Sequence, residues 1–551
     1  MDNINPVIIN LLNNRGIVSE NDIAEFLSAK PQKTYDPFLL LNMEDGVDLI
    51  LRTIEKGEKI CIYGDYDADG ITSTSLMMKA LSHLTDNVDY YIPSRFDEGY
   101  GLNMSAIEKI YNDGVGLIIT VDCGSVSHAE VEYAKSLGIK VIITDHHNIT
   151  DVIADCIVIN PKQPDCEYPF KQLAGVGVAF KLVQALQRES DLPKSVLKEL
   201  LDLVAIGTIA DVVPLVDENR TLVKYGLNEL NKLERKGLKA LVGAIYKRSE
   251  EITSENVAYI IAPHLNAVGR MLSADVAVEL LISEDEVIIS ENVNKLIESN
   301  NERKRIQEKI YIDCEEIVEK HLSDKKFFLI CVPDAHEGIT GIVAGNIKEK
   351  YNRPTVVMTK SGVHHKGTGR SIKAINLYEL LNNFKELFVK FGGHSGACGF
   401  SMQEENLQAL KRGLEEKANE MYEAHPEMFE EQFDFDMEIT GQDVTILLGE
   451  LVSSLAPFGH QNEKPIFCIK NVTISNVSFM GNEGTHLRFT SNCNDGTLLQ
   501  CVLFQKAKDY QEIVMSGEPV NLFGSIEVST WNETKRIQFI TLKITSCENQ
   551  E

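Results

Sequence analysis

The segment Lys59-Ile-Cys-Ile-Tyr63-Gly-Asp65-Tyr-Asp67-Ala-Asp69-Gly70 places a short apolar run directly before three aspartates. Similar apolar runs occupy residues 88–92, 117–121, 140–144 and 156–159, and segments of helical character lie between them at 73–83, 105–112 and 127–137. Short apolar strands that alternate with helices indicate βαβ units and a mostly parallel sheet. The sequence therefore predicts an α/β fold built on that sheet.

The chain as a whole divides by pattern into five parts. We expect a lead-in (1–50), a parallel-sheet domain (51–225), a helical connector (226–324), a second α/β domain (325–430) and a linker with a small all-β barrel (431–551). Within the connector, the charged stretch 284–321 predicts a long helix that joins two domains. The second α/β domain should have strands near 327–332 and 355–359, with glycine-rich turns between them.

The net charge limits the partners that the surface can bind. Lysine and arginine number 54 and aspartate and glutamate 82, which gives a formal charge of −28. Such a surface repels nucleic acid, so binding requires a locally basic channel or metal ions. Residues 361–373 hold two histidines, two lysines and one arginine without an acid, and they form one such basic segment.

Composition also predicts where the protein works. Hydrophobic residues make up 43% of the chain, which excludes wholesale disorder. No apolar run reaches the roughly 18–20 residues that cross a bilayer, and the first residues do not resemble a signal peptide. Eleven cysteines without a Cys-x-x-Cys pair indicate reduced thiols. We therefore expect a cytoplasmic protein with no membrane partner.

Acidic residues follow several of the predicted strands. The carboxyl ends of parallel strands meet at one edge of a sheet, so these side chains should converge there. Converging carboxylates raise each other's pKa, and a pair of divalent cations resolves that conflict. Carboxylates with imidazole favour Mn²⁺ or Mg²⁺. The clusters are Asp65, Asp67 and Asp69, then Asp122, then Asp145-His146-His147, and finally Asp211 at the end of an apolar helical stretch.

Each cluster alone has a simpler interpretation. Asp-x-Asp-x-Asp-Gly is also typical of a calcium loop, but Leu76 stands where that loop needs a glutamate. An isolated Asp-His-His is usually a surface turn, and an aspartate after a strand is usually a helix cap. The ordered set, each member ending an apolar element, favours a metal site.

These motifs, with Val121-Asp122-Cys-Gly124 and Gly207-Thr-Ile-Ala-Asp211, resemble the four signatures of the DHH phosphoesterase superfamily. Within it the chain is most similar to the bacterial single-strand-specific exonucleases. The resemblance implies that Asp122 bridges two metal ions, that Asp65 supports their ligands and that His147 contacts the scissile phosphate. The implied metal ligands are Asp67, Asp69, Asp122, His146 and Asp211.

The second α/β region resembles the DHH-associated domain of this superfamily, which binds substrate. The similar segments are residues 338–347, 366–371 and 392–399. The resemblance implies that the 5′ end and nearby phosphates are held by Arg95, Arg270, Arg370, Ser371 and His394. His336 occupies the place of a family histidine without an assigned role. Ala335, Cys398 and the turn 458–465 depart from the family pattern, and these departures concern the grip on the strand rather than the metal chemistry.

The C-terminal region resembles the OB-fold domain of the same exonucleases. Such barrels bind single strands in a groove and stack bases on aromatic side chains. The candidates for stacking are Phe479, Phe489, Trp531 and Phe539, about half of which we expect in the barrel core.

The leading hypothesis is therefore a metal-dependent exonuclease that degrades single-stranded DNA from the 5′ end to mononucleotides, in DNA repair and recombination. One alternative is a DHH phosphodiesterase of short oligonucleotides or cyclic dinucleotides, which the C-terminal barrel disfavours. Another is a non-catalytic replication scaffold, which the complete ligand set disfavours. The resemblance implies a monomer that acts on single-stranded DNA with a single-strand-binding protein and a helicase as partners.

Overall fold

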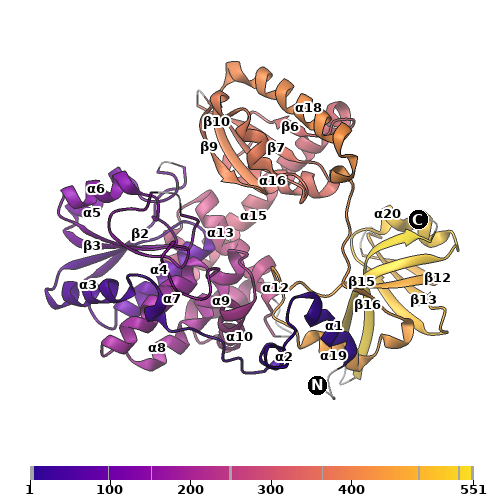
Figure 1. Ribbon diagram of the computed structural model, residues 1–551, viewed down its shortest axis with the longest axis horizontal. Coiled ribbons are helices and arrows are strands. Elements are labelled where there is room, and N and C mark those ends of the chain that lie inside the picture. Colours follow the sequence, from indigo (N-terminus) through magenta and orange to yellow (C-terminus); the bar gives the residue numbers. More distant parts are fainter. Residues whose placement is uncertain are drawn as a thin grey trace. The chain divides into compact units, whose positions relative to one another are not determined.

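The computed structural model describes residues 5–96, 98–149, 152–246, 251–362, 364–481, 484–531 and 534–547. Contacts within the chain divide it into two compact units (Figure 1). Unit 1 comprises Met1–Pro93, Tyr100–Ala262 and Asp434–Glu551, and unit 2 comprises Ser94–Gly99 and Pro263–Phe433. Among the described residues, none of the helices combines the length and apolar character required to span a membrane.

Unit 1 contains a five-stranded sheet in the order β2-β1-β3-β4-β5, and every pairing in it is parallel. The strands are β1 (Lys59–Tyr63), β2 (Val88–Tyr91), β3 (Val115–Val121), β4 (Lys140–Thr144) and β5 (Ile157–Ile159). The predicted parallel sheet is confirmed. The strand order reverses between β1 and β3, and the crevice beyond their carboxyl ends is where open α/β sheets bind ligands.

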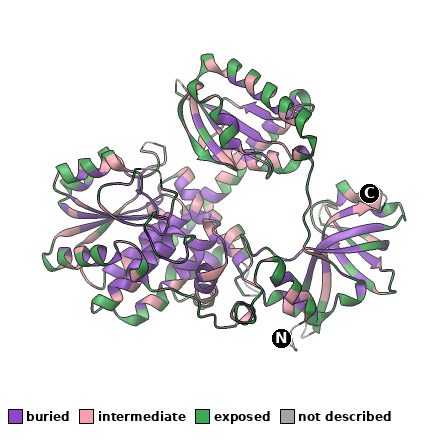
Figure 2. Cartoon of the chain, in the orientation of Figure 1, coloured by how far each residue is buried: buried purple, intermediate pink, exposed green. Residues whose placement is uncertain are grey.

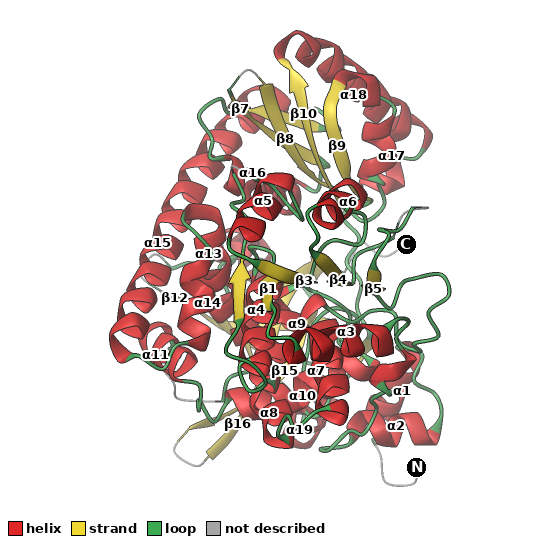
Figure 3. Ribbon diagram, turned by 90° about the vertical axis from the view of Figure 1, so that its left-hand side faces the viewer, coloured by secondary structure: helices red, strands yellow, loops and turns green. Residues whose placement is uncertain are grey.

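Helices cover both faces of this sheet (Figure 3). On one face, α5 (Met104–Asn112) and α6 (His128–Ser136) share an apolar core with β1, β3 and β4. On the other face lie α3 (Met43–Glu55), α4 (Ala68–Leu81) and α7 (Gly175–Glu189). Because both faces are covered, β3 is buried along nearly its whole length, as Figure 2 shows in purple.

Helix α4 begins at Ala68, several residues before the predicted start at 73. The side chain of Asp67 caps it by accepting hydrogen bonds from two backbone N–H groups of the first turn. Its early turns are buried but polar, because the hydroxyls of Thr72, Thr74 and Ser75 each donate to a backbone carbonyl four residues earlier at 2.8 Å. Because these hydroxyls form hydrogen bonds within the helix, polar residues can be buried there, and a search for apolar residues at helical spacing misses the first turns of α4.

Residues 194–210 form two helices that meet at Leu200. As predicted for the helical connector 226–324, its described residues form no strand. The remaining helices of this half of unit 1 are α8 (Lys194–Glu199), α9 (Leu201–Ala210), α10 (Asp217–Leu230), α11 (Lys236–Ile245), α12 (Ser254–Asn256), the π-helix η2 (Val257–Ile261) and the 3₁₀ helix η1 (Pro37–Leu39).

The C-terminal part of unit 1 is a closed barrel, because β12 pairs with both β13 and β15 in the sheet β11-β12-β13-β14-β16-β15. This confirms the predicted OB-like domain. Its elements are β11 (Met437–Glu438), β12 (Phe467–Met480), β13 (His486–Asn492), β14 (Leu498–Leu503), β15 (Val520–Trp531), β16 (Thr534–Ser546), α19 (Ile446–Ser453), η7 (Gly441–Asp443) and α20 (Ala507–Met515), a helix that the sequence pattern did not predict.

The N-terminal lead-in completes the core of this barrel. Its helices are α1 (Pro6–Asn14) and α2 (Glu20–Leu27), and Figure 1 shows α1 in indigo beside the yellow barrel. Leu11, Leu12 and Ile23 are buried in the same cluster as the barrel residues Phe467 and Phe489. The two ends of the chain therefore fold together.

Unit 2 contains a mixed sheet in the order β6-β7-β8-β10-β9, in which only β6 and β7 are parallel. Its strands are β6 (Phe328–Cys331), β7 (Thr355–Ser361), β8 (His364–Arg370), β9 (Phe388–His394) and β10 (Ala397–Gln403). The predicted long helix is α15 (Glu286–Ile317). The other helices are α13 (Ala262–Met271), α14 (Asp275–Ile282), η3 (Val318–Leu322), α16 (Glu337–Tyr351), α17 (Leu377–Asn382), η4 (Lys385–Leu387), η5 (Glu404–Asn406), α18 (Leu407–Ala424) and η6 (Pro426–Phe429).

The prediction of glycine-rich turns between 332 and 355 is wrong, because that stretch forms α16. The glycine-rich segments 366–371 and 392–399 lie largely in β8, β9 and β10, which were not predicted as strands. Glycine is needed there for packing. A Cβ on Gly367 would lie 2.4 Å from the Phe400 ring, and one on Gly369 would lie 2.7 Å from Leu377. Large neighbouring side chains pack directly against the backbone of β8 at Gly367 and Gly369. Glycine at these positions therefore indicates close packing rather than a turn.

A buried ion pair joins α7 to the start of α10. Lys181 Nζ lies 2.9 Å from Glu218 Oε1, and both side chains are almost fully buried. Lys181 also donates to the carbonyl of Tyr35 at 2.6 Å, and the hydroxyl of Tyr168 donates to Glu218. Every polar group of the pair is thereby engaged.

Glu218→Gln should lower the free energy of unfolding by about 3–5 kcal/mol, because it leaves the Lys181 ammonium buried without its counter-charge. Urea denaturation of the full chain measures this. Glu132→Gln, which removes an exposed partner of Lys135 on α6, serves as the control and should leave the stability unchanged. Equal stability of the Glu218 variant and the control would contradict the role of the pair.

Candidate metal centre

The acidic clusters of unit 1 converge at the carboxyl edge of the parallel sheet. Three of them follow β1, β3 and β4 directly, and Asp211 is the C-cap of α9. Around His146 Nε2, the nearest carboxylate oxygens are Asp122 Oδ1 at 3.1 Å, Asp211 Oδ2 at 3.6 Å and Asp69 Oδ2 at 4.0 Å. The structure thus brings together residues from all four sequence motifs.

The backbone around the cluster is shaped to admit these side chains. Asp122 has a φ of +61°, a left-handed conformation that aims its carboxylate back over the sheet edge. A Cβ on Gly175, at the first turn of α7, would lie 2.5 Å from Asp122 Oδ1. A Cβ on Gly207 in α9 would lie 2.8 Å from Asp69 Oδ1. Both helices can approach the carboxylates only because these two positions are glycine.

Two helix N-termini stabilise the negative charge of the first cluster. Asp67 Oδ1 accepts hydrogen bonds from Asp69 N at 2.9 Å and Gly70 N at 3.1 Å. The carboxylate of Asp69 accepts from Gly175 N at 2.7 Å and Val176 N at 2.8 Å. Backbone N–H groups at a helix start favour anionic partners.

These amides do not cancel the repulsion among the carboxylates. Burial, and next the charge of Asp67, raise the pKa of Asp69 to about 7. Burial and the charges of Asp69 and Asp67 raise the pKa of Asp211 to about 8. Burial and the same neighbours raise the pKa of Asp122 well above its ordinary value. The cluster therefore carries more negative charge than its protein surroundings neutralise.

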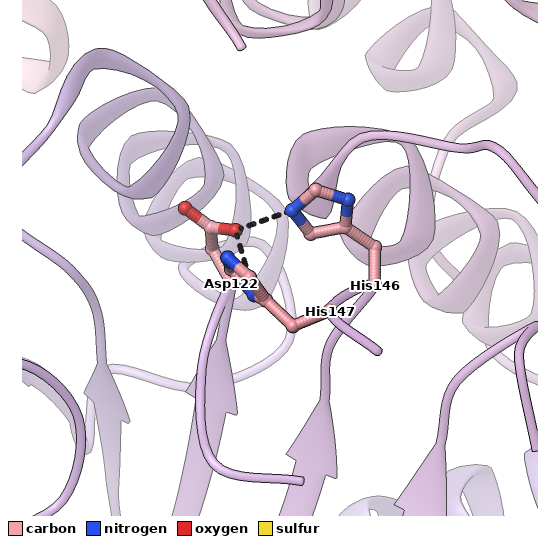
Figure 4. A group of neighbouring side chains, drawn as sticks. All are labelled: Asp122, His146 and His147. Carbon is pink, nitrogen blue, oxygen red and sulfur yellow. Dashed lines mark ion pairs between the residues drawn. The ribbon is translucent and has the colours of Figure 1, made fainter. Parts of the chain in front are cut away.

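The donor set fits divalent metal ions. Figure 4 shows the carboxylate of Asp122 facing the imidazoles of both His146 and His147, and these three residues form one group whose ligand atoms lie within 4.8 Å of one another. Two further groups of the same tightness are Asp69 with His146 and Asp211, and Asp65 with Asp67 and Asp122. Burial, and next the charge of His147, lower the pKa of His146 to about 3, so its imidazole is neutral and able to bind a metal. Asp122 Oδ1 is buried without a hydrogen-bond donor among the described residues, as a metal ligand would be.

Asp145 is a site residue to which sequence reasoning assigned no role. Its Oδ1 accepts from His147 Nδ1 at 2.8 Å and from His146 N at 2.7 Å, and its Oδ2 accepts from Ser125 N at 2.9 Å. Burial opposes the charge on both partners, but their hydrogen bond raises the pKa of His147 to about 9 and lowers that of Asp145 below its ordinary value. The sequence signal for this role was the position of Asp145, two residues before His147.

Tyr100 is a second residue of the site that was not predicted from the sequence. Its hydroxyl donates to the carbonyl of Asp122 at 3.1 Å and lies 3.1 Å from His147 Nδ1. The Tyr100 ring meets the His147 ring edge to face. Asp145 and Tyr100 together hold the imidazole of His147 on two sides.

The residues predicted to bind DNA phosphates all lie in unit 2. Arg270 donates to the carbonyl of Gly338 at 2.6 Å, at the first turn of α16. Burial lowers the pKa of His336, and after the opposing effect of Glu337 the charges of Arg95 and Arg270 lower it further, so these two guanidinium groups lie close to the imidazole. Gly341 of the same helix faces Arg370, because a Cβ there would be 3.3 Å from the guanidinium.

Ser371 and His394 adjoin Arg370. In the sheet, Ala397 pairs with Arg370 on one side and His394 on the other. The Ser371 hydroxyl donates to the carbonyl of Ile375 at 2.7 Å, so this hydrogen bond already uses its proton. Cys398, which departs from the family pattern, is buried with its Sγ 3.4 Å from the carbonyl of His394. Ala335, the other departure, is buried in the core beside β6 and α16.

The aromatic candidates of the barrel separate into two kinds. Phe489 and Phe539 are fully buried, whereas Phe479 is 46% exposed. The side chain of Trp531 lies outside the described residues. Phe504, which was not predicted, is exposed and packs edge to face on His486. The barrel therefore presents Phe479 and Phe504 as exposed rings.

Comparisons with known proteins agree with this layout. Residues 59–208 match the DHH family N-terminal domain, 324–420 the DHHA1 domain and 435–542 the RecJ OB domain. The single-stranded-DNA-specific exonuclease RecJ of Bacillus subtilis is 39% identical over 98% of this chain and 67% of its own length. That of Escherichia coli is 33% identical over 84% of this chain and 83% of its own.

Solved structures of RecJ from Thermus thermophilus contain either of the two expected metals. The complex with Mn²⁺ has a TM-score of 0.82 at 27% identity and covers 100% of this chain and 77% of the other. The complex with Mg²⁺ has a TM-score of 0.76 at 26% identity and covers 98% and 75%. The carboxylate and imidazole set of this chain suits the same ions.

Asp122→Asn should abolish the stabilisation that Mn²⁺ gives to the folded chain while leaving the metal-free fold intact. The amide keeps the shape of the side chain but removes one of the converging charges, so the metal-free melting temperature should stay equal or rise. Melting with EDTA and with Mn²⁺ measures both effects. The exposed substitution Asp48→Asn is the control, and an undiminished Mn²⁺ effect in the Asp122 variant would contradict the assignment.

Proposed function

Because this chain belongs to the RecJ family of single-stranded-DNA-specific exonucleases, we propose that it hydrolyses single-stranded DNA from the 5′ end and releases mononucleotides. The observation that carries the proposal is the convergence of five aspartates and two histidines at one sheet edge, with the pKa values of three aspartates raised. We also propose that this activity serves DNA repair and recombination.

The ligands would be shared between two ions. Asp65 and Asp67 would hold one, Asp69 and Asp211 with His146 would hold the other, and Asp122 would lie between them. This differs from the sequence expectation in giving Asp65 a direct role. Bound divalent ions supply a water of lowered pKa and neutralise charge on the phosphoryl group.

The chain's own residues orient the reacting phosphate. Asp145 fixes the imidazole of His147 through Nδ1, and Tyr100 limits its rotation from the other side. A cationic imidazole in this place would contact a phosphate oxygen. Attack of water on phosphorus with cleavage of the P–O3′ bond releases a mononucleotide with a 3′ hydroxyl. The shortened strand then keeps a 5′ phosphate, so each cycle regenerates the same end.

The cations of unit 2 would recognise that end. Arg95, Arg270 and Arg370 surround the first turns of α16, where guanidinium groups and helix N–H groups both favour phosphate. Ser371 and His394 continue this group along β8 and β9. The exposed rings Phe479 and Phe504 would stack on bases farther along the strand.

We further propose the cellular setting. A single-strand-specific nuclease needs strands that have been separated, so a helicase and a single-strand-binding protein are the expected partners of a monomeric enzyme. All eleven cysteines are free thiols, which suits the reducing cytoplasm.

The substrate test uses 5′-labelled single-stranded DNA, its 3′-labelled counterpart, a duplex and a dinucleotide, each with Mn²⁺ and with EDTA. The 5′ label should appear as mononucleotide while the 3′-labelled strand is still long, and EDTA should stop the reaction. Hydrolysis of the dinucleotide with survival of the long strand would instead favour the short-oligonucleotide phosphodiesterase. Absence of any metal-dependent cleavage would favour the scaffold.

Asp145→Asn should lower kcat on single-stranded DNA about 10–100-fold, because His147 loses the acceptor that orients it. The Mn²⁺-induced rise in melting temperature should persist, since Asp145 is a positioning residue rather than a ligand in this assignment. Asp155→Asn, an exposed substitution at the start of the segment that leads into β5, is the control. A Mn²⁺ effect that is lost together with kcat would contradict the positioning role.

A further inference from the structure

Unit 1 contains a cavity of about 590 Å³ away from the sheet edge that carries the metal residues. Three parts of the chain line it: the lead-in helices with the segment after them, the first turns of α10, and the turn before the barrel. The lining residues that matter here are Arg15, Phe26, Lys33, Asp217, Arg220 and Gln461. A cavity of this size accommodates a small molecule.

The acidic groups of the cavity already have partners. Asp217 forms an ion pair with Lys33 at 2.8 Å and accepts from the hydroxyl of Tyr35 at 3.1 Å. Glu25 accepts from the backbone N–H of Lys33 at 2.9 Å, and Asp22 accepts from the hydroxyl of Ser19 at 2.6 Å. Lys33 is thus neutralised within the cavity wall.

Two guanidinium groups of the cavity, Arg15 and Arg220, form no such ion pair among the described residues. Arg220 is only 3% exposed and donates to three carbonyls: those of Phe26 at 3.2 Å, Leu455 at 2.8 Å and Ala456 at 2.9 Å. Its Nε is buried without a hydrogen-bond acceptor among the described residues. The Phe26 ring covers one face of the guanidinium at 3.8 Å, which leaves the Nε edge for another acceptor.

Arg15 repeats this pattern from the end of α1. Its guanidinium donates to the side-chain oxygen of Asn462 and to the carbonyl of Glu463 at 2.6 Å. Neither Arg15 nor Arg220 forms an ion pair within the described parts of the chain. Burial comes first among the effects that lower the pKa of both groups, and the charge of Arg15 adds to it for Arg220. Arg15 is half-buried, and the charges of Asp436 and Glu463 raise its pKa against the effect of burial. Arg220 is buried beside this like charge with no such offset, so an anion between the two guanidinium groups would lower the cost of burying it.

We propose that this cavity binds a small phosphate-bearing anion between Arg15 and Arg220, either inorganic phosphate or the phosphate group of a mononucleotide. Guanidinium groups match the geometry of phosphate oxygens and remain charged when buried. The ligand would contact the lead-in, α10 and the turn before the barrel at once, so its binding would tighten the junction of these three parts. This site is independent of the proposed nuclease activity.

The test is calorimetric titration of the full chain with inorganic phosphate and then with thymidine monophosphate, in EDTA and at constant ionic strength. Saturable binding should weaken at least tenfold in Arg15→Gln and remain in Arg52→Gln, an exposed arginine on α3 that serves as the charge-matched control. Binding should also remain in Arg370→Ala, which removes one of the separate phosphate-binding residues proposed for unit 2. Tighter binding of the nucleotide than of phosphate identifies a nucleotide site, and equal binding identifies a phosphate site.

Binding that is lost in Arg370→Ala but kept in Arg15→Gln would overturn the proposal, as would the absence of saturable binding in the unmodified chain. Melting of Arg15→Gln in chloride shows whether the variant is folded. Arg15→Lys is the second variant, because it keeps the charge but loses the planar fork. Its phosphate affinity should fall between those of the unmodified chain and Arg15→Gln, and unchanged affinity in both variants would also contradict the site.

Discussion

Repulsion among buried carboxylates is the constraint on which the architecture of unit 1 depends. Asp69 and Asp122 are almost fully buried within a few ångströms of Asp211, and no lysine or arginine forms an ion pair with them among the described residues. The sheet edge holds them together because β1, β3 and β4 are fixed by parallel pairing on both sides. The amides of α4 and α7 stabilise part of the charge, and the remainder makes the cluster selective for divalent cations.

The same constraint explains the distribution of charge over the chain. With a net charge of −28, most of the surface repels DNA, and the metal residues themselves would repel a phosphodiester without bound cations. Several cationic side chains gather at the first turns of α16 and along β8. The proposed metal ligands and the proposed phosphate-binding groups are therefore carried by different units.

The sequence predicted the strands of the parallel sheet best where an apolar run ends at an acidic residue. The strands β1 and β4 match their predicted bounds because apolar runs with clear ends are strong signals. The start of α4 escaped detection because its buried face is made of hydroxyls bonded to their own helix. The strands β8 and β10 were not predicted because their glycines give no apolar alternation, and those of β8 make room for Phe400 and Leu377. Contacts of this kind join residues distant in sequence, and a single sequence does not display them.

The site shows a similar division between local and long-range information. The positions of Asp67, Asp122 and His146 could be predicted, because each lies in a short motif beside its strand. The roles of Asp145 and Tyr100 could not, because they depend on the direction in which the His147 ring points. Lys181 and Glu218 likewise form a pair across 37 positions of sequence, with no local pattern in either segment.

The departure of residues 458–465 from the family pattern has less effect than their sequence suggests. The loop that carries Asp211 runs into α10, and the backbone N–H of Leu215 in that loop donates to the carbonyl of His460 at 2.8 Å. The hydroxyl of Ser254 donates to the carbonyl of Phe458 at 2.7 Å. Arg220 likewise donates to the carbonyls of Leu455 and Ala456, just before this turn. Because main-chain oxygens make these contacts, they depend on the backbone path of the turn and not on most of its side chains. The exception is Asn462, whose side chain accepts from Arg15 and donates to the carbonyls of Leu455 and Pro457, and so helps to fix that path.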